Sequence, residues 1–314
     1  MKIAFLYAGQ GAQHAGMGAE LYEKEPAFRA AFDAGNLDFD RKKICFEDPD
    51  GLLVQTQYTQ PCMTAVALGI TDVLRENGIH PDYAAGLSLG EYAALYAAGV
   101  WNADIAMETV AFRGRAMQKA AEGIECGMTA VLGMEEAELS ACCREASAEG
   151  IVSICNYNCP GQLVIGGEKR AVEQAGALAK ERGARRCVPL AVSGPFHTSL
   201  MKPAGDALAE WFEKIPFGEM KVPVLFNCLG REKEEADSIR DLLVRQVQSP
   251  VRMEDTIRRL LELGVDTFVE IGPGKTLTGF VKKTAKAAGK DGLHLFGIEN
   301  EEGLQEFLSW YREA

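Results

Sequence analysis

The sequence predicts an α/β protein with one large domain and a smaller domain inserted in it. Short apolar runs alternate with longer segments of helical period, which is typical of α/β folds. Between about residues 125 and 195 the elements instead follow the order βαββαβ, which is the ferredoxin-like order. With 314 residues, 47% of them hydrophobic, the chain has enough apolar material for a large core.

The first elements along the chain belong to the large domain. The run "KIAFLYAG" is predicted to form a strand that leads into the glycine-rich turn "GQGAQHAGMG". Residues 61–78 have the period of an amphipathic helix, and Gly78 ends it. A second strand precedes "GLSLGEY" at 86–92, one helix follows it, and another is expected over about 102–121.

The inserted subdomain is predicted over 125–195, so the large domain comprises 1–124 and 196–314. Because clefts form preferentially between domains, the active site is expected in the cleft between the two. The predicted strands of the insertion are "GMTAVLG", "IVSICNYN", "GQLVIGG" and "RRCVPLAV", and its helices are "EEAELSACCREASAEG" and "KRAVEQAGALAKERG". The large domain resumes with the strand or helix candidates "VPVLFN", "RMEDTIRRLLELG", "TFVEIG" and "LHLFGI".

Composition and charge argue against several classes of function. A formal charge of −12 repels nucleic acid and anionic membrane surfaces, so neither is expected as a partner. No stretch reaches the roughly 18 apolar residues of a membrane span, and no charged leader precedes "IAFLYAG". The nine cysteines lack CxxC pairs and a completing histidine, which indicates reduced, mostly buried thiols, no metal site and a cytoplasmic location.

The glycine-rich segment "GPGKT" at 272–276 resembles part of a phosphate-binding loop. The P-loop needs a glycine five positions before its Gly-Lys pair, and position 269 is a valine. The segment is therefore predicted to be a strand-to-helix turn.

The pentapeptide G-x-S-x-G at 86–90 places Ser88 between a predicted strand and a predicted helix. In such a turn Gly86 and Gly90 lack the Cβ atoms that would collide where the two elements meet, and the hydroxyl stands at the start of the helix. The backbone N–H of Leu89 then points to the position where an oxyanion forms. Ser88 is the candidate nucleophile, and an ordinary serine N-cap is the alternative.

A serine nucleophile needs a base, and the chain has four histidines. His80 lies in a predicted turn, and His294 lies in a predicted strand, where a hydrogen-bonded structural role is expected. His14 lies in the first glycine loop and stays an alternative candidate for the base. His197 lies in "SGPFHTSLM", where the subdomain rejoins the large domain, and is the candidate base. No acidic third member stands out among 45 Asp and Glu, so a Ser–His dyad is predicted.

An arginine occupies an inward position of the helix expected over 102–121. Ala106, Val110, Arg113, Met117 and Ala121 share one helical face. A guanidinium that faces inward must be paired or reach the rim. Its role is either structural, or it grips the carboxylate of a substrate through two parallel N–H···O bonds.

Eight motifs occur in an order found in one enzyme family: "GQGAQ", "TQP", "GLSLGEY", "FRGRAMQ", "NYNCPGQLVIGG", "SGPFHTSLM", "QVQSPVRM" and "VEIGPGKTL". Through them the chain resembles, nearly end to end, the malonyl-CoA:acyl carrier protein transacylases of fatty-acid synthesis and the related acyltransferases of polyketide synthases. The resemblance implies an α/β-hydrolase-like domain with a ferredoxin-like insertion. It also implies an enzyme that binds no permanent cofactor and takes malonyl-CoA and acyl carrier protein as substrates; we expect a monomer.

By position, the resemblance assigns the nucleophile to Ser88, the base to His197 and the carboxylate-binding arginine to Arg113. It assigns the oxyanion donors to the backbone N–H groups of Gln10 and Leu89. These five residues form the core of the predicted site.

Three further residues correspond to family positions around that core. Gln246 matches a residue whose main-chain carbonyl orients the histidine. Gln60 and Phe196 match pocket positions, and Phe196 resembles the residue of malonyl-selective members. The chain departs from the family at Leu87, where histidine is common, and in its first motif, which has "AGQGAQ" instead of "PGQGSQ".

The predicted reaction is transfer of malonyl from coenzyme A to the phosphopantetheine thiol of acyl carrier protein through a malonyl-serine intermediate. The alternatives are a serine esterase or thioesterase, an acyltransferase of a polyketide pathway, and a non-catalytic docking module. Because acyl carrier proteins are acidic, docking needs a local basic surface. The candidates are Lys180, Arg182, Arg185 and Arg186, or Lys282, Lys283 and Lys286, unless these are ordinary solvated helix faces.

Overall fold

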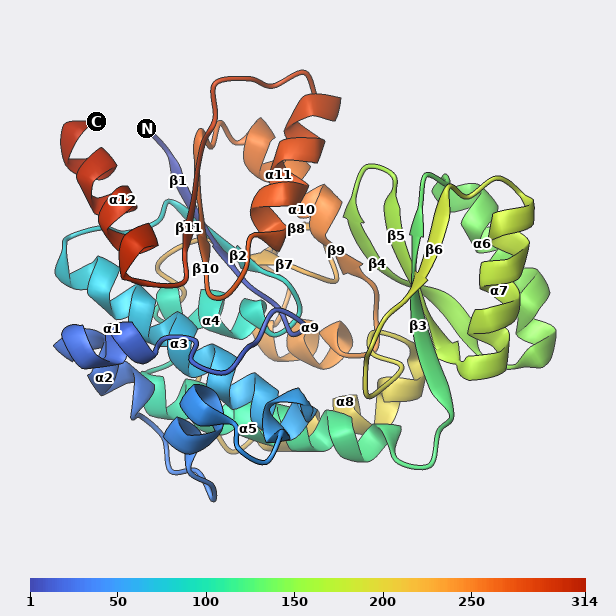
Figure 1. Cartoon of the computed structure of the whole chain (residues 1–314), viewed down its shortest axis with the longest axis horizontal. Coiled ribbons are helices and arrows are strands. Elements are labelled where there is room, and N and C mark those ends of the chain that lie inside the picture. Colours follow the sequence, from blue (N-terminus) through green and yellow to red (C-terminus); the bar gives the residue numbers. More distant parts are fainter.

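The computed structural model describes residues 1–314 and is a mixed α/β protein with two main sheets (Figure 1). One is a four-stranded parallel sheet in the order β11-β10-β1-β2. Its strands are β1 (Ile3–Tyr7), β2 (Tyr83–Gly86), β10 (Thr267–Ile271) and β11 (His294–Ile298). Every position of β1 and β10 is buried, as expected for parallel strands covered on both faces.

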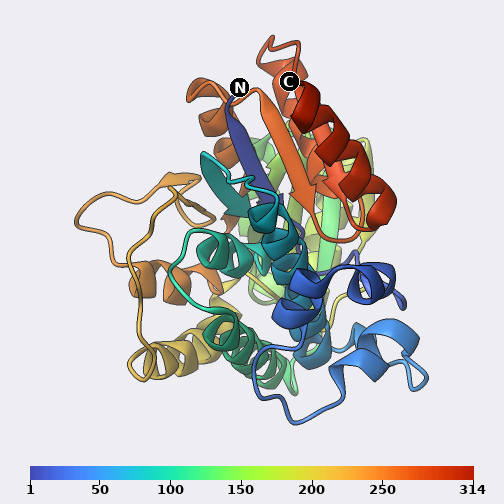
Figure 2. The same cartoon turned by 90° about the vertical axis from the view of Figure 1, so that its left-hand side faces the viewer.

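Helices cover both faces of this sheet. Successive side chains of β1 point to opposite faces and therefore pack against different helices. Phe5 and Tyr7 belong to one hydrophobic cluster with α2 to α5, α8, α9 and α12, whereas Ala4 and Leu6 belong to a second cluster with α10 and α11. The bounds of the helices outside the second sheet are α1 (Ala19–Lys24), α2 (Pro26–Phe32), α3 (Thr56–Glu76), α4 (Gly90–Ala97), α5 (Ala103–Ala121), α8 (Lys202–Phe212), α9 (Ile239–Gln246), α10 (Met253–Glu262), α11 (Thr276–Ala287) and α12 (Glu301–Glu313). Both chain ends lie at one end of the sheet (Figure 2).

The second sheet has five strands in the order β6-β3-β5-β4-β9 and lies beside the first sheet and its helices (Figure 1). Its consecutive elements are β3 (Cys126–Leu132), α6 (Glu136–Ala146), β4 (Val152–Cys159), β5 (Gln162–Glu168), α7 (Lys169–Glu181) and β6 (Arg186–Pro189). Neighbouring strands among these four are antiparallel, and α6 and α7 form a third hydrophobic cluster with β3, β4 and β5. The fifth strand, β9 (Val251–Arg252), comes from the C-terminal part of the chain and pairs in parallel with β4.

Most elements expected from the sequence are confirmed, with shifted ends. Helix α3 begins at Thr56, upstream of the predicted start, so Pro61 lies inside it. The segment "VPVLFN" forms only the short β7 (Leu225–Phe226), which pairs with β8 (Arg231–Glu232), and one bridge from Val224 to Ala84 of the large sheet. Helices α1, α2, α8, α9 and α12 were not predicted. Short 3-10 or π-helical turns occupy Lys43–Glu47, Leu52–Val54, Ser147–Glu149 and Ser199–Met201.

The turn at 272–276 connects β10 to α11, as predicted. The carboxylate of Glu270 accepts hydrogen bonds from the backbone N–H groups of Leu277 (2.9 Å) and Thr278 (2.7 Å). A carboxylate of the protein therefore satisfies the N-terminus of α11, where a P-loop would present those donors to a phosphate.

The nine cysteines are all free; seven are buried and two are partly exposed, as expected for reduced thiols. No group of three or more His, Cys, Asp and Glu side chains is arranged to hold a metal ion. None of the helices combines the length and the apolar character needed to cross a bilayer.

Candidate active site

Ser88 lies on a tight turn between β2 and α4, and its backbone has a φ of 53°, in the left-handed region. The two flanking glycines make this turn possible. A Cβ on Gly86 would come within 2.0 Å of the carbonyl carbon of Gly90, and a Cβ on Gly90 would come within 2.2 Å of the backbone oxygen of Tyr7. The strand, the turn and the helix are thus packed backbone to backbone, and this lifts the hydroxyl of Ser88 to the carboxyl end of the parallel sheet.

His197 faces Ser88 from the loop before Ser199, and its Nε2 is 2.7 Å from the serine Oγ. Its Nδ1 is 2.8 Å from the backbone oxygen of Gln246. A carbonyl oxygen only accepts, so Nδ1 carries the proton and Nε2 is left to accept the serine proton. Burial, together with the positive charge of Arg113, lowers the pKa of His197 to about 4, and the imidazole is therefore neutral near pH 7.

Arg113 of α5 is completely buried, together with the other four residues of its predicted inward face. Its Nη2 donates hydrogen bonds to Ser88 Oγ (3.0 Å) and to Gln246 Oε1 (3.0 Å), whereas its Nε and Nη1 have no partner. The guanidinium carbon lies 5.0 Å from the centre of the Tyr92 ring, and no carboxylate forms an ion pair with it. Burial lowers the pKa of Arg113.

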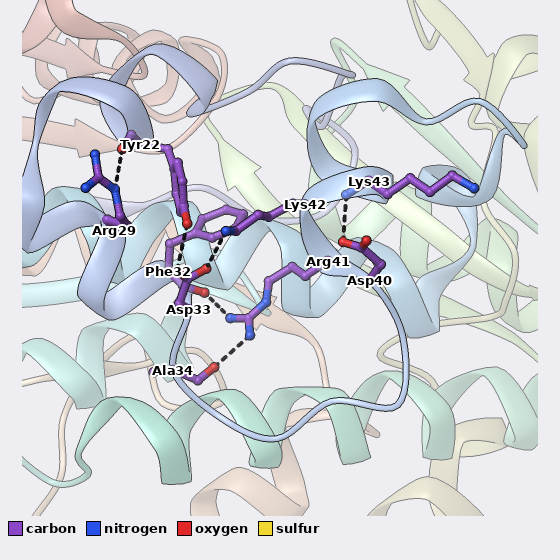
Figure 3. A network of polar contacts seen from close by, with 9 residues as sticks. All are labelled: Tyr22, Arg29, Phe32, Asp33, Ala34, Asp40, Arg41, Lys42 and Lys43. Atoms are coloured by element: carbon purple, nitrogen blue, oxygen red, sulfur yellow. Dashed lines mark hydrogen bonds and ion pairs between the residues drawn. The ribbon is translucent and has the colours of Figure 1, made fainter.

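A second buried arginine, Arg41, has an ordinary structural environment (Figure 3). Its guanidinium donates to the backbone oxygens of Phe32, the last residue of α2, and of Ala34 just beyond it, where carbonyls lack helical partners. Backbone carbonyls thus satisfy Arg41, whereas two nitrogens of Arg113 remain unpaired beside the candidate nucleophile. The contrast favours a substrate partner for Arg113 over a structural one.

The side chain of Gln246 joins the parts of the site in a way that the sequence did not indicate. Its Nε2 donates to the backbone oxygen of Ser88 (2.8 Å), and its Oε1 accepts from Arg113. Since its own backbone oxygen holds His197, one residue at the end of α9 contacts all three members of the predicted site.

Asn227 and Glu91 are two further buried polar residues at the serine turn, and neither was singled out in the sequence. Asn227 bonds the backbone on both sides of Leu87: its Oδ1 accepts from Ser88 N (2.6 Å), and its Nδ2 donates to Gly86 O (2.7 Å). Glu91 accepts the backbone N–H of Asn227 (2.5 Å). Burial raises the pKa of Glu91 to about 8, although the positive charge of Arg113 opposes this shift.

The predicted oxyanion donors lie at the same cavity as Ser88. The backbone N–H groups of Gln10 and Leu89 make no hydrogen bond within the chain, and both residues line the cavity. By contrast, the N–H of Ser88 is already bonded to Asn227. The side chain of Gln10 is held by Thr56 Oγ1 at 3.1 Å.

A cavity of about 510 Å³ opens over these groups between the large domain and the second sheet. Gln60 and Phe196 line it, as predicted, and both are buried. The amide of Gln60 contacts only Met117 Sδ (3.5 Å) through Nε2, and its Oε1 has no partner. Leu87 also lines the cavity and packs against the second hydrophobic cluster, so the departure from the family's histidine places an apolar side chain beside the turn.

None of the other three histidines lines the cavity. His14 and His80 are exposed, and the ring of His14 contacts only the backbone oxygen of Ala15 (3.1 Å). His294 is also exposed and packs its ring 4.8 Å from that of Trp310 without a hydrogen bond. The expectation of a hydrogen-bonded structural histidine in this strand is therefore wrong.

Comparison with known proteins identifies the family. The family model of the acyl transferase domain matches residues 4–312. The chain belongs to the acyl transferase family. The malonyl CoA-acyl carrier protein transacylase of Bacillus subtilis is 44% identical to this acyltransferase over 285 residues, which cover 90% of both chains. That of Escherichia coli is 39% identical over 285 residues, which cover 90% of this chain and 92% of the relative.

Solved structures agree with the family over the whole length of the acyltransferase. A malonyl CoA-acyl carrier protein transacylase from Clostridium perfringens superposes with a TM-score of 0.94 at 40% identity, over 100% of this chain and 98% of that one. A malonyl-transacylase in complex with a type II polyketide synthase acyl-carrier protein gives 0.92 at 38% identity, over 98% and 99%. The predictions of the family and of an acyltransferase enzyme are confirmed.

Proposed function

We propose that this acyltransferase moves the malonyl group of malonyl-CoA to the phosphopantetheine thiol of acyl carrier protein and thereby supplies fatty-acid synthesis. The relatives that carry this activity in their names support the proposal. The observation on which it depends most is the contact of Arg113 Nη2 with Ser88 Oγ at 3.0 Å. A nucleophile and a buried cation this close fit an acyl group with a carboxylate at its far end.

In the first half-reaction His197 Nε2 takes the proton of Ser88 Oγ as the oxygen attacks the thioester carbonyl. The electron pair of the carbonyl moves to its oxygen, which the N–H groups of Gln10 and Leu89 receive; each such donor contributes about 3–4 kcal/mol to the transition state. Collapse of this intermediate expels the thiolate of coenzyme A, which takes the proton from His197. A malonyl ester of Ser88 remains.

In the second half-reaction the thiol of the carrier protein gives its proton to His197 and attacks the ester. The same donors stabilise the second oxyanion, and Ser88 recovers its proton when the new thioester forms. One thioester is exchanged for another, so the transfer is nearly reversible. Water must therefore be kept from the ester, and a malonyl carboxylate held on Arg113 orients the ester toward the thiol.

The binding of the acyl group uses the remaining polar and apolar walls of the cavity. Gln246 fixes Arg113 and His197 together, and Gln60 offers an unpaired Oε1 close to Met117. Phe196 limits the space beside the acyl carbon, so we expect the enzyme to prefer malonyl over α-methyl extender units. No permanently bound cofactor takes part in this mechanism.

For the carrier protein we propose docking on α11. Thr276 and Phe280 of this helix line the cavity, and Lys282, Lys283 and Lys286 are exposed further along it. A carrier protein bound to these lysines would present its phosphopantetheine toward Ser88. The other basic set is less suitable because Arg182 is engaged by Glu145. The cytoplasmic location and the monomeric state stay predictions.

We propose the finer description of the fold as an α/β-hydrolase-like domain, 1–124 and 196–314, with a ferredoxin-like subdomain over 125–195. The βαββαβ order of β3 to β6 and the strand order β6-β3-β5-β4 support the second part. The serine turn at the carboxyl end of the parallel strand β2 supports the first.

Intact-mass measurement after mixing with malonyl-CoA tests the proposed function. A stable malonyl adduct that maps to Ser88, is absent in Ser88→Ala and is discharged by holo acyl carrier protein is the expected result. Rapid release of coenzyme A with free malonate and no malonyl carrier protein would instead identify a thioesterase. Retained transfer in Ser88→Ala would identify a different nucleophile.

A further inference from the structure

The serine turn is held by a side chain from a distant part of the chain, and this contact lies outside the catalytic dyad. Asn227 follows β7, whose neighbour Val224 bridges to β2 at Ala84. Its side-chain amide donates to Gly86 O and accepts from Ser88 N, so it bonds the backbone of the turn immediately before and immediately after Leu87. Because a backbone N–H only donates and a carbonyl only accepts, the orientation of the amide is fixed by its partners.

The amide of Asn227 is itself immobilised. Its backbone N–H donates to Glu91 Oε2, and its backbone oxygen accepts from Arg252 N at 2.9 Å. Glu91 lies three residues after Ser88, on the first turn of α4, and has no exposed surface. A closed ring of contacts therefore runs from the serine turn through Asn227 and Glu91 back to the helix that the turn begins.

We propose that Asn227 is a positioning residue for the nucleophile and that Glu91 holds Asn227 in place. The inference rests on the proposed function, because it concerns the same Ser88. Two consequences for the chemistry follow from the contacts. Asn227 stabilises the left-handed backbone of Ser88, which an L-residue adopts only when its surroundings impose it. It also occupies the N–H of Ser88, so that the oxyanion is left to the free N–H groups of Gln10 and Leu89.

The first test replaces Asn227 by alanine and compares it with Asn300→Ala. Asn300 also bonds a backbone N–H, that of Gly303 at 3.0 Å, but caps α12 away from the cavity. We expect Asn227→Ala to lower kcat for malonyl transfer by about 10- to 100-fold, the scale for a reacting group displaced by about 1 Å, with KM for malonyl-CoA within about twofold. Its labelling by a fluorophosphonate, which needs Ser88 but not Arg113, should slow to a similar extent. Asn300→Ala should lose thermal stability and keep both rates.

The second test uses Asn227→Asp, because a neutral carboxyl group keeps both hydrogen bonds. Its carbonyl oxygen accepts from Ser88 N and its hydroxyl donates to Gly86 O, whereas the ionised form turns an acceptor toward the Gly86 carbonyl. Burial favours the neutral form, so the ratio of kcat for this variant to wild-type kcat should rise as the pH is lowered from about 8 to about 5.5. The titratable or charged groups around position 227 are Glu91 on α4, Arg113 on α5 beside Glu91, the adjacent Cys228, and Arg245 on α9 and Asp237, which act on Cys228.

The outcomes separate this inference from the proposed function. If the wild-type protein forms no malonyl-serine, the proposed function fails. If the wild-type protein transfers malonyl and Asn227→Ala keeps its kcat and its fluorophosphonate rate, the positioning role is refuted. A change confined to KM refutes it as well. Should Asn227→Ala not fold, a pH-independent activity ratio for Asn227→Asp would still refute it.

Discussion

Replacing Arg113 by alanine is the sharpest perturbation of the donor site. Arg113 lines the cavity beside Ser88, with Nη2 shared between Ser88 and Gln246 and with Nη1 unpaired. A malonyl carboxylate gives Nη1 a charged partner and replaces the neutral serine oxygen at Nη2. A hydrogen bond to a charged group contributes about 1.5–3 kcal/mol, and the exchange at Nη2 contributes less, so together they give about 3 kcal/mol. At 1.36 kcal/mol per tenfold change in rate, kcat/KM for malonyl-CoA should fall about 150-fold.

The same substitution has a second expected result, for stability. When one partner of a buried structural ion pair is removed, the charge left unpaired in the interior destabilises the protein by about 3–5 kcal/mol. Arg113 forms no ion pair, and its removal relieves the burial of an incompletely satisfied charge next to a polar cavity. The melting temperature of Arg113→Ala should therefore stay within a few degrees of the wild-type value.

The assay compares malonyl-CoA and acetyl-CoA as donors to holo acyl carrier protein for wild type, Arg113→Ala and Arg115→Ala. Arg115 lies on the same helix, is exposed and contacts Asp38 at 3.7 Å, so its variant controls for the loss of an arginine. Loss of malonyl transfer with acetyl transfer unchanged or increased is expected for Arg113→Ala alone. Equal losses for both donors, or a large drop in melting temperature, would refute the carboxylate clamp.

Three other perturbations test the electrostatics and the packing of the site. The base must be neutral, so kcat/KM should fall on the acid side with the pKa of about 4 of His197, and Arg113→Ala should move this limb to higher pH because a nearby positive charge is lost. In the folded protein the pKa of Glu91 is about 8, whereas its ordinary value is 4.5. Its contribution to the free energy of unfolding is therefore complete below about pH 4.5 and is lost as the pH rises from there to about 8. Glu91→Gln should therefore gain stability over the wild-type protein as the pH rises through that window, in urea unfolding at several pH values. Gly90→Ala puts a Cβ within 2.2 Å of a backbone oxygen of β1 and should unfold the protein or abolish activity, whereas Gly176→Ala in α7, with open space around its Cβ, should raise the melting temperature.

The sequence predicts those residues of the site whose role requires a recognisable pattern of residue types nearby in the chain. The close contact of Gly86 with Gly90 lies within five residues, whereas Gly90 also packs against Tyr7 of β1. The pentapeptide together with the predicted strand and helix on either side of it therefore indicates the turn. Arg113 stands out because the helical period places it among apolar residues, and all of that face is buried. Of the four histidines, only His197 lies at the predicted junction of the two domains, and the structure brings it to 2.7 Å from Ser88 Oγ.

Other residues of the site leave no such pattern, because only the folded chain brings them together. The proposed roles of Gln10 and Leu89 use only their backbone N–H groups, so their side chains carry no signal. Leu89 follows from its place after the serine in the pentapeptide, whereas Gln10 is named only through the resemblance to a family. Asn227 and Gln246 lie 139 and 158 residues from the serine to which they bond. One signal for Asn227 is present in the sequence: a polar residue follows directly after the apolar run "VLF", which is buried in the structure.

The buried charges of the site explain why a carbonyl, and not a carboxylate, orients the histidine. An aspartate at the position of Gln246 O would raise the pKa of His197 and would lie close enough to Arg113 to neutralise it. The guanidinium would then bind a protein carboxylate, and the malonyl carboxylate would have to displace it. Glu91, the nearest acid in the interior, has a pKa raised to about 8 and is mostly uncharged at neutral pH. Under the proposed function, the site keeps one positive charge uncompensated until a substrate supplies the negative one, and the backbone carbonyl that orients His197 contributes to donor specificity.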